Sequence, residues 1–252
     1  MKSISLVVIT YNEEANIEPC IRSTGDIADE VIVVDSFSTD RTCEIAERCG
    51  ARVMRHKFEG HIEQKNWAKE QATGDWILSL DADETLDNVL FAEIKKWKHI
   101  EQYHTTGLLL NRLNFYCGKP YRTFGWYPDK KIRLWKKELG TWKGVNPHDQ
   151  LVMKRGEPTK ALRGHILHNT YPTRQSFLEQ REKFANISAQ HIKDENIVFL
   201  FFKLLFSAPY KFLRCYILHF GVIEGVTGLF ISYHLSREVF LKYFRAIKLK
   251  YS

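Results

Sequence analysis

The chain predicts an α/β fold in which a parallel sheet is followed by a mixed sheet and a helical tail. Residues 1–90 alternate continuous apolar runs with helical stretches, and residues 105–170 carry shorter strands separated by glycine and proline turns. The segment after residue 193 is apolar, aromatic and basic. Continuous apolar runs are typical of strands buried on both faces, and repeated β-α-β units make such strands parallel.

The first part of the chain is expected to alternate strands with helices. A strand is predicted wherever a β-branched run is bounded by polar turn residues. The predicted strands are 4–9, 30–35, 51–54 and 76–80, and the predicted helices are 16–23, 42–49 and 62–71. The carboxyl ends of parallel strands meet at one edge of the sheet, where open α/β sheets bind ligands.

The second part of the chain changes character. Short strands are expected at 107–114, 131–135 and 151–154, and we interpret them as a mixed sheet that forms the second wall of a cleft. Apolar residues at helical spacing predict a helix over 174–192. We therefore expect a domain over 1–192, with halves 1–104 and 105–192, and an extension over 193–252.

The tail predicts basic amphipathic helices. From Lys203 to Ser252 it holds eight Lys and Arg residues against Glu224 and Glu238, a net charge of +6 (eight minus two), among many Phe, Leu, Ile and Tyr residues. Helices of this kind suit the headgroup region of an anionic bilayer. Packing of the apolar faces on the domain or on a second subunit is the alternative.

Composition and charge limit the class of protein. A net charge of +7 indicates an anionic partner such as a nucleotide, a nucleic acid, a phosphorylated glycan or an acidic membrane, although plain solubility also explains it. The five cysteines lack paired metal spacing, which favours free thiols in a reducing compartment. The apolar run 4–9 is too short for a signal peptide, and charges interrupt the apolar runs of the tail, so we expect a cytoplasmic protein.

Carboxylates follow three of the predicted strands. Asp81 and Asp83 stand at the end of the strand 76–80, where two carboxylates can turn toward one Mg²⁺ or Mn²⁺ that bridges a diphosphate. Tyr11 follows the first strand and could lie against a base, while Asp35 ends the second and could accept a bond from a base or a ribose. Each loop taken alone also fits a capped helix start or a solvated turn.

Four motifs in order resemble those of the family 2 glycosyltransferases of the GT-A fold, which are inverting enzymes that use nucleotide sugars. The matching segments are Val8-Ile9-Thr10-Tyr11-Asn12-Glu13-Glu14, Val33-Val34-Asp35-Ser36 with Asp40 and Thr42, Gln64-Lys65-Asn66 with Ala68, and Asp81-Ala82-Asp83-Glu84. The resemblance implies that Asp83 binds the metal, that Asp81 lies near the sugar and ribose, and that Lys65 approaches the base or diphosphate. It implies that the nucleotide is held by Thr10, Tyr11, Glu13 and Asp35.

The resemblance also implies a catalytic base. An inverting transfer needs a carboxylate that takes the proton of the acceptor hydroxyl. In the subgroup that this chain resembles, the base lies in a Val-His-Glu-type stretch, which corresponds here to residues 144–150. Asp149 is the candidate base and His148 its acceptor-side neighbour. Asp replaces the usual Glu, and an Asp that caps a turn after Pro147 is the alternative.

Later segments resemble bacterial lipopolysaccharide inner-core β-1,4-glucosyltransferases. The similarity covers 165–189 and 209–229, although these motifs are less specific. It implies transfer of a hexose, with glucose from UDP-glucose as the specific expectation, to a heptose of the lipopolysaccharide core. The enzyme would then act as a peripheral protein on the inner face of the bacterial inner membrane, with no nucleic acid as partner.

A cationic and aromatic segment over 119–143 is a candidate surface for the acceptor. Aromatic faces stack on sugars and cations meet phosphates, so we expect Trp126 and Tyr127 to contact sugar. A solvated basic face is the alternative reading.

Two other functions fit single features. Residues 81–85 also match the Asp-x-Asp-x-Thr loop of haloacid-dehalogenase-type phosphatases, but that loop normally follows the first strand of its fold. A basic nucleic-acid-binding protein would explain the charge, but its carboxylate loops would repel phosphates.

Overall fold

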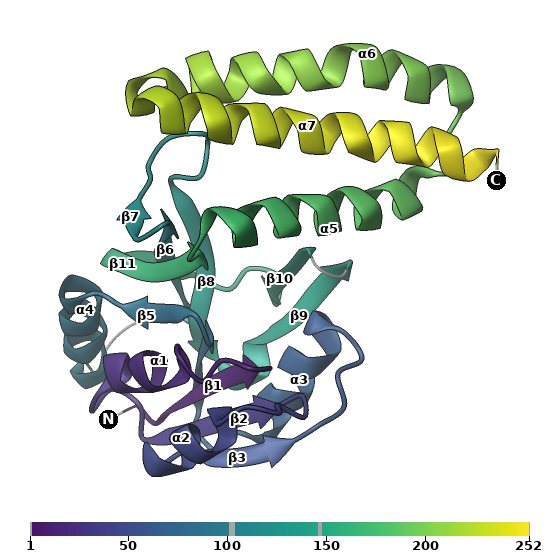
Figure 1. Cartoon of the computed structure of the whole chain (residues 1–252). Coiled ribbons are helices and arrows are strands. Elements are labelled where there is room, and N and C mark those ends of the chain that lie inside the picture. Colours follow the sequence, from purple (N-terminus) through teal and green to yellow (C-terminus); the bar gives the residue numbers. More distant parts are fainter. Residues whose placement is uncertain (1, 101–103, 146–147, 252) are drawn as a thin grey trace. The chain divides into compact units, whose positions relative to one another are not determined.

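The computed structural model describes residues 2–100, 104–145 and 148–251, and its contacts divide the chain into two compact units (Figure 1). Unit 1 comprises residues 1–113 and 129–168. Unit 2 comprises residues 114–128 and 169–252.

Unit 1 begins with the predicted parallel sheet. Strands stand in the order β3-β2-β1-β4, and each neighbouring pair is parallel. They are β1 (Ile4–Thr10), β2 (Glu30–Asp35), β3 (Arg52–Arg55) and β4 (Trp76–Asp81), and the connecting helices are α1 (Ile17–Thr24), α2 (Thr42–Arg48) and α3 (His61–Gln71). These bounds confirm the predicted order of elements.

The sheet continues past β4 as a mixed sheet. Strand β8 (Asp129–Lys136) runs antiparallel to β4, and the order then continues β6-β11-β5. The further elements are β5 (Glu84–Leu86), α4 (Asn88–His99), β6 (Gly107–Tyr116), the short β7 (Lys119–Pro120), η1 (Lys137–Leu139), β9 (Gly140–Val145), β10 (His148–Met153) and β11 (Thr159–Tyr171). Strands β9 and β10 form a separate two-stranded sheet. The prediction of a mixed α/β fold is confirmed, but β5, α4, β9 and β11 were not predicted.

Side chains on both faces of the unit 1 sheet are buried. On one face Leu6 and Val8 join a core with residues of α1, α2 and α4. On the other face Val7 packs with Ala68 of α3 and Trp142 of β9. This burial on both faces explains why the strands read as continuous apolar runs rather than alternating ones.

The cationic and aromatic segment 119–143 is only partly a surface. Arg133, Trp135 and Trp142 are buried in unit 1, and Tyr121 and Phe124 are buried in unit 2. Their assignment to an acceptor surface was therefore wrong. Trp135 and Trp142 lie on inward-facing positions of β8 and β9, and Tyr121 and Phe124 pack in an apolar cluster of unit 2, so these four rings are core residues.

Unit 2 consists mainly of helices. They are α5 (Arg174–Ile192), α6 (Ile197–Leu213), the π-helical turn η2 (Arg214–Leu218), the 3₁₀ turn η3 (Gly221–Glu224) and α7 (Gly225–Lys250). Both α5 and α6 pack on α7, and Phe177 of α5 shares an apolar cluster with Cys215, Ile231 and Leu235. The predicted helices of the tail are confirmed. The compact units divide the chain differently from the predicted domains at 192/193, which stay a prediction as functional boundaries.

Among the described residues, no single helix is long and apolar enough to cross a membrane. One pair of helices, Ile197–Leu218 and Gly221–Lys250, bent at the break between them, passes that test of length and composition together.

Candidate active site

The carboxyl ends of β1, β2 and β4 bring three predicted site residues to one edge of the sheet. The strand register pairs Thr10 with Asp35 and Ile9 with Asp81. The predicted meeting of these loops is thus a consequence of the parallel register in unit 1.

Asp81 lies between two cations. Its Oδ1 is 2.9 Å from Lys65 Nζ, and its Oδ2 is 3.0 Å from Arg133 Nη2. Burial opposes ionisation of this carboxyl, but Lys65 and Arg133 outweigh burial and hold the pKa of Asp81 well below its usual range. Asp81 is therefore a fixed negative charge near neutral pH.

Glu84 fixes the end of the Asp81 loop from inside the protein. It is fully buried, its Oε1 lies 3.1 Å from Arg133 and 3.2 Å from Arg112, and its Oε2 accepts a hydrogen bond from the backbone N–H of Asp81. No pattern in the sequence predicts this role of Glu84. The interaction depends on arginines of two later strands, β6 and β8, so no pattern of neighbouring residues predicts it.

Asp149 is brought to the same cluster by Lys65. Lys65 Nζ is 2.9 Å from Asp149 Oδ2 as well as from Asp81, and it lies 4.6 Å from the ring centroid of Trp142. The Lys65 side chain is 5% exposed, so one buried ammonium holds two carboxylates that are far apart in the sequence. The candidate base and the carboxylate motif therefore lie in one site of unit 1.

Asp83 pairs with His168, which was not among the predicted site residues. Asp83 Oδ2 is 3.1 Å from Nε2 of His168, which lies on β11 where His168 is paired with Glu84. A carboxylate oxygen and an imidazole nitrogen at this spacing suit a divalent cation such as Mn²⁺ or Mg²⁺ that takes its other ligands from a bound diphosphate. No group of three or more His, Cys, Asp or Glu side chains with metal-binding geometry occurs in the part of the chain that the structure describes.

The residues predicted to hold the nucleotide lie at or just after the carboxyl ends of β1 and β2. Asp35 is buried and accepts a hydrogen bond from the backbone N–H of Ser38, whereas Tyr11 is 58% exposed. Burial raises the pKa of Glu13, and the neighbouring charges of Asp83, Asp40 and Asp81 raise it further despite a bond from Asn16. The hydroxyl of Thr10 is buried without a hydrogen-bond partner among the described residues.

Three further predicted site residues, Trp126, Tyr127 and His148, stay predictions as acceptor contacts. Trp126 and Tyr127 belong to unit 2, where Trp126 packs among Phe124 and Tyr171, and their contact with sugar stays a prediction. His148 opens β10, but its side chain lies outside the described part of the structure.

Comparison with known proteins gives the family. The family model described as Glycosyl transferase family 2 matches residues 5–155, which include the whole cluster except His168. The chain belongs to glycosyl transferase family 2. It is therefore a glycosyltransferase, and the haloacid-dehalogenase and nucleic-acid readings have no support beyond the features that raised them.

Similar proteins extend over nearly the whole length of this glycosyltransferase. An uncharacterized glycosyltransferase of Rickettsia typhi is 28% identical over 258 residues, covering 99% of this chain and 87% of the relative. The lipopolysaccharide core biosynthesis glycosyltransferase LpsC of Rhizobium meliloti is 25% identical over 252 residues, covering 95% and 93%. Among solved structures, glucosyl-3-phosphoglycerate synthase of Mycobacterium tuberculosis with Mn²⁺ and UDP is 28% identical over 46% of this chain and 45% of that chain. The TM-score between the two chains is 0.35.

Proposed function

We propose that this family 2 glycosyltransferase transfers a hexose, specifically glucose from UDP-glucose, to a heptose of the lipopolysaccharide inner core with inversion at the anomeric carbon. One observation carries the proposal: Lys65 joins Asp81, on the donor side, to Asp149, the candidate base, at 2.9 Å from each. The similarity to LpsC supports lipopolysaccharide core as the acceptor class.

The donor is proposed to bind along the edge formed by β1, β2 and β4. Exposed Tyr11 offers a face for the base, Asp35 and Glu13 offer carboxylates to base and ribose, and Thr10 has a buried hydroxyl available. Arg133 keeps Nε and Nη1 without partners among the described residues, so the site retains buried donors for a diphosphate or sugar oxygen.

The metal is proposed to be held by Asp83 and His168. When bound, Mg²⁺ or Mn²⁺ would offset the charge of the departing diphosphate. Asp83 and His168 supply only two protein ligands, which leaves the remaining positions to donor oxygens. The sequence predicted Asp83 as the only protein ligand of the metal, and this proposal adds His168.

The proton is proposed to pass from the acceptor hydroxyl to Asp149. In an inverting transfer the hydroxyl attacks the anomeric carbon from the side opposite the leaving diphosphate, so the base must stand on the acceptor side. Lys65 orients Asp149 relative to Asp81 and thereby fixes the distance between the base and the donor. His148, Trp126 and Tyr127 are proposed to contact the acceptor.

The enzyme is proposed to work on the inner face of the bacterial inner membrane, where a lipid-linked acceptor would be presented. The direct test incubates the protein with a panel of nucleotide sugars, Mg²⁺ or Mn²⁺, and truncated lipopolysaccharide. A mass increase of one hexose on the acceptor with UDP-glucose is the expected result. Transfer from another donor only, or to an acceptor without heptose, would overturn the corresponding part of the proposal.

A further inference from the structure

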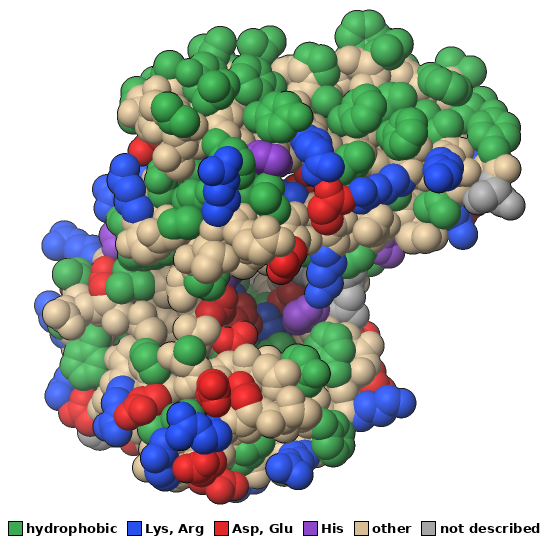
Figure 2. Space-filling view, viewed as in Figure 1, with side chains coloured by type: hydrophobic (Ala, Val, Ile, Leu, Met, Phe, Trp, Pro, Cys, Tyr) green, Lys and Arg blue, Asp and Glu red, His purple; other side chains and the backbone are tan. Residues whose placement is uncertain are grey.

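The outer surface of α6, η2, η3 and α7 is unusually apolar for a surface in water. Helix α6 buries only Leu200 and Ala208, although charged residues occupy just two of its positions, Lys203 and Lys211. Figure 2 shows hydrophobic side chains gathered on the surface over α6 and the adjoining α7. The side chains of this apolar face, each more than a third exposed, include Phe201, Phe202, Leu205, Phe206, Tyr210, Leu213, Ile217, Leu218, Phe220, Val222, Ile223, Val226 and Leu229.

The helices of unit 2 pack against one another through other side chains than those of this apolar face. The inner sides of the helices already make their own contacts: Ser236 Oγ donates to the Ala208 carbonyl at 2.6 Å, and Leu200 packs with Ala246 and Ala189. A helix that is apolar all round is normally buried in protein or in lipid. A continuous exposed patch of this kind marks an interaction site.

We propose that the apolar face of α6–α7 inserts into the acyl region of one leaflet of an anionic bilayer. This deepens the peripheral-membrane part of the proposed function and rests on it for the choice of partner. Charge favours lipid over a second copy of the chain. Lys203, Lys211 and Arg214 make no ion pair with any described carboxylate, and the two acids of the tail, Glu224 and Glu238, pair with Lys119 and Arg181. A two-fold interface through these helices would place two surfaces of the same positive charge against each other, whereas an anionic bilayer would neutralise them.

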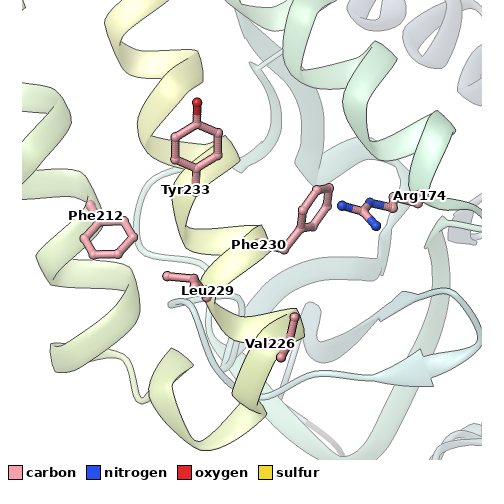
Figure 3. Close-up of a pocket in the computed structure, with 6 residues that line it drawn as sticks. All are labelled: Arg174, Phe212, Val226, Leu229, Phe230 and Tyr233. Atoms are coloured by element: carbon pink, nitrogen blue, oxygen red, sulfur yellow. The ribbon is translucent and has the colours of Figure 1, made fainter.

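A groove on the same unit has the chemistry of a lipid contact. It measures about 450 Å³ and is lined by Phe212, Val226, Leu229, Phe230, Tyr233 and Arg174 (Figure 3). Three of these, Val226, Leu229 and Tyr233, are exposed, so the groove opens among the exposed side chains of α7. The Arg174 guanidinium lies 3.7 Å from the ring centroid of Phe230 and has no carboxylate partner among the described residues. An apolar groove with one available cation suits an acyl chain with its headgroup phosphate.

The test measures partition of the full chain onto vesicles of phosphatidylcholine, with or without phosphatidylglycerol, by flotation. The double variant Phe202→Ser with Phe206→Ser removes two exposed rings of α6, and we expect the partition coefficient to fall by about tenfold or more. Phe58→Ser, at a similarly exposed ring of unit 1, is the matched control and should bind like the unmodified protein. Lys203→Gln should weaken binding only to the phosphatidylglycerol vesicles, whereas Arg174→Gln should weaken binding to both kinds of vesicle, because both lipids carry a headgroup phosphate.

The variant Phe206→Trp distinguishes insertion of α6 into the acyl region from contact at the membrane surface. Its fluorescence, taken as the difference from the unmodified protein, should be quenched by lipids brominated on the acyl chain. Three outcomes would overturn the proposal: no binding to either vesicle, equal binding by the double variant, or a concentration-dependent dimer that the same double variant dissociates. The assay contains neither nucleotide sugar nor acceptor, so its result is independent of whether the proposed transfer occurs.

Discussion

At the level of single residues, Asp149, which Lys65 holds beside Asp81, is expected to act in proton transfer but not in donor binding. Asp149→Asn keeps the size of the side chain but cannot take a proton, so we expect the rate of transfer to fall by about 10²–10⁴-fold while UDP affinity is kept. Single-turnover transfer and calorimetric titration with UDP would measure the two effects. Asp149→Glu is the control, since it keeps the base and restores the residue usual in the subgroup. Undiminished transfer by Asp149→Asn would rule out Asp149 as the base.

The neighbouring pair, Asp83 and His168, has a matched control on the same strand. His168→Ala should weaken UDP binding in the presence of Mn²⁺ by about tenfold or more and leave metal-free binding unchanged, because only a metal ligand is lost. His165 lies three positions earlier on β11, where its Nδ1 is 3.1 Å from Asp87 rather than Asp83. His165→Ala should therefore spare the Mn²⁺ effect. Equal losses in both variants would show that His168 has only a structural role.

At the level of elements, Gly164 shows how β11 passes helix α4. Its φ is +85°, and a Cβ there would lie 2.3 Å from the backbone N of Leu90 and 2.6 Å from Asp87 Oδ1, the N-cap of α4. Gly164→Ala should lower the free energy of unfolding by roughly 2–4 kcal/mol, through strain and overlap together. Gly156 has φ of +84° but open space around it, so Gly156→Ala should cost only about 1 kcal/mol. Urea denaturation would measure both, and equal losses would contradict the argument from α4.

In unit 2, an acid on α5 joins that helix to α7. Glu182 accepts hydrogen bonds from Arg245, at 2.5 Å, and from Arg237. The bond from Arg245 lowers the pKa of Glu182, burial opposes the shift, and Arg237 lowers the pKa further. Because the folded-state pKa is depressed, this stabilisation is complete above the unfolded value of about 4.3 and is lost as pH falls below it.

We therefore expect Glu182→Gln to reduce the free energy of unfolding near neutral pH by about 0.5–1 kcal/mol, a modest value because solvent screens a side chain about a third exposed. The difference from the unmodified protein should be smaller at a pH below the unfolded pKa of about 4.3 than at neutral pH. Denaturation at both pH values measures it. A difference that is equally large in acid would mean that packing, rather than charge, carries the effect.

At the level of the whole molecule, the sequence was most informative where patterns are local. Apolar runs located β1, β2 and β4, and helical spacing located α5, because each depends on neighbours in the chain. Glu84 and His168 escaped prediction because their partners come from strands that are distant in sequence. Trp135 and Trp142 were misassigned for a related reason: composition cannot tell an aromatic ring on a core-facing strand position from one on a surface.

The two compact units lead to a prediction about truncation. Helix α5 belongs with α7, where Phe177 packs with Ile231 and Leu235, although the sequence placed the boundary after Ile192. A chain ending at Ile192 would expose Phe177, Ala185 and Ala189, all fully buried in the full chain. We expect that shorter chain to bind a hydrophobic dye strongly, to associate, and to show a separate low-temperature transition for the remnant of unit 2, because α5 alone cannot bury its apolar side. A monodisperse chain of 1–192 without dye binding would instead support the boundary predicted from the sequence, because α5 would then be stable without α7.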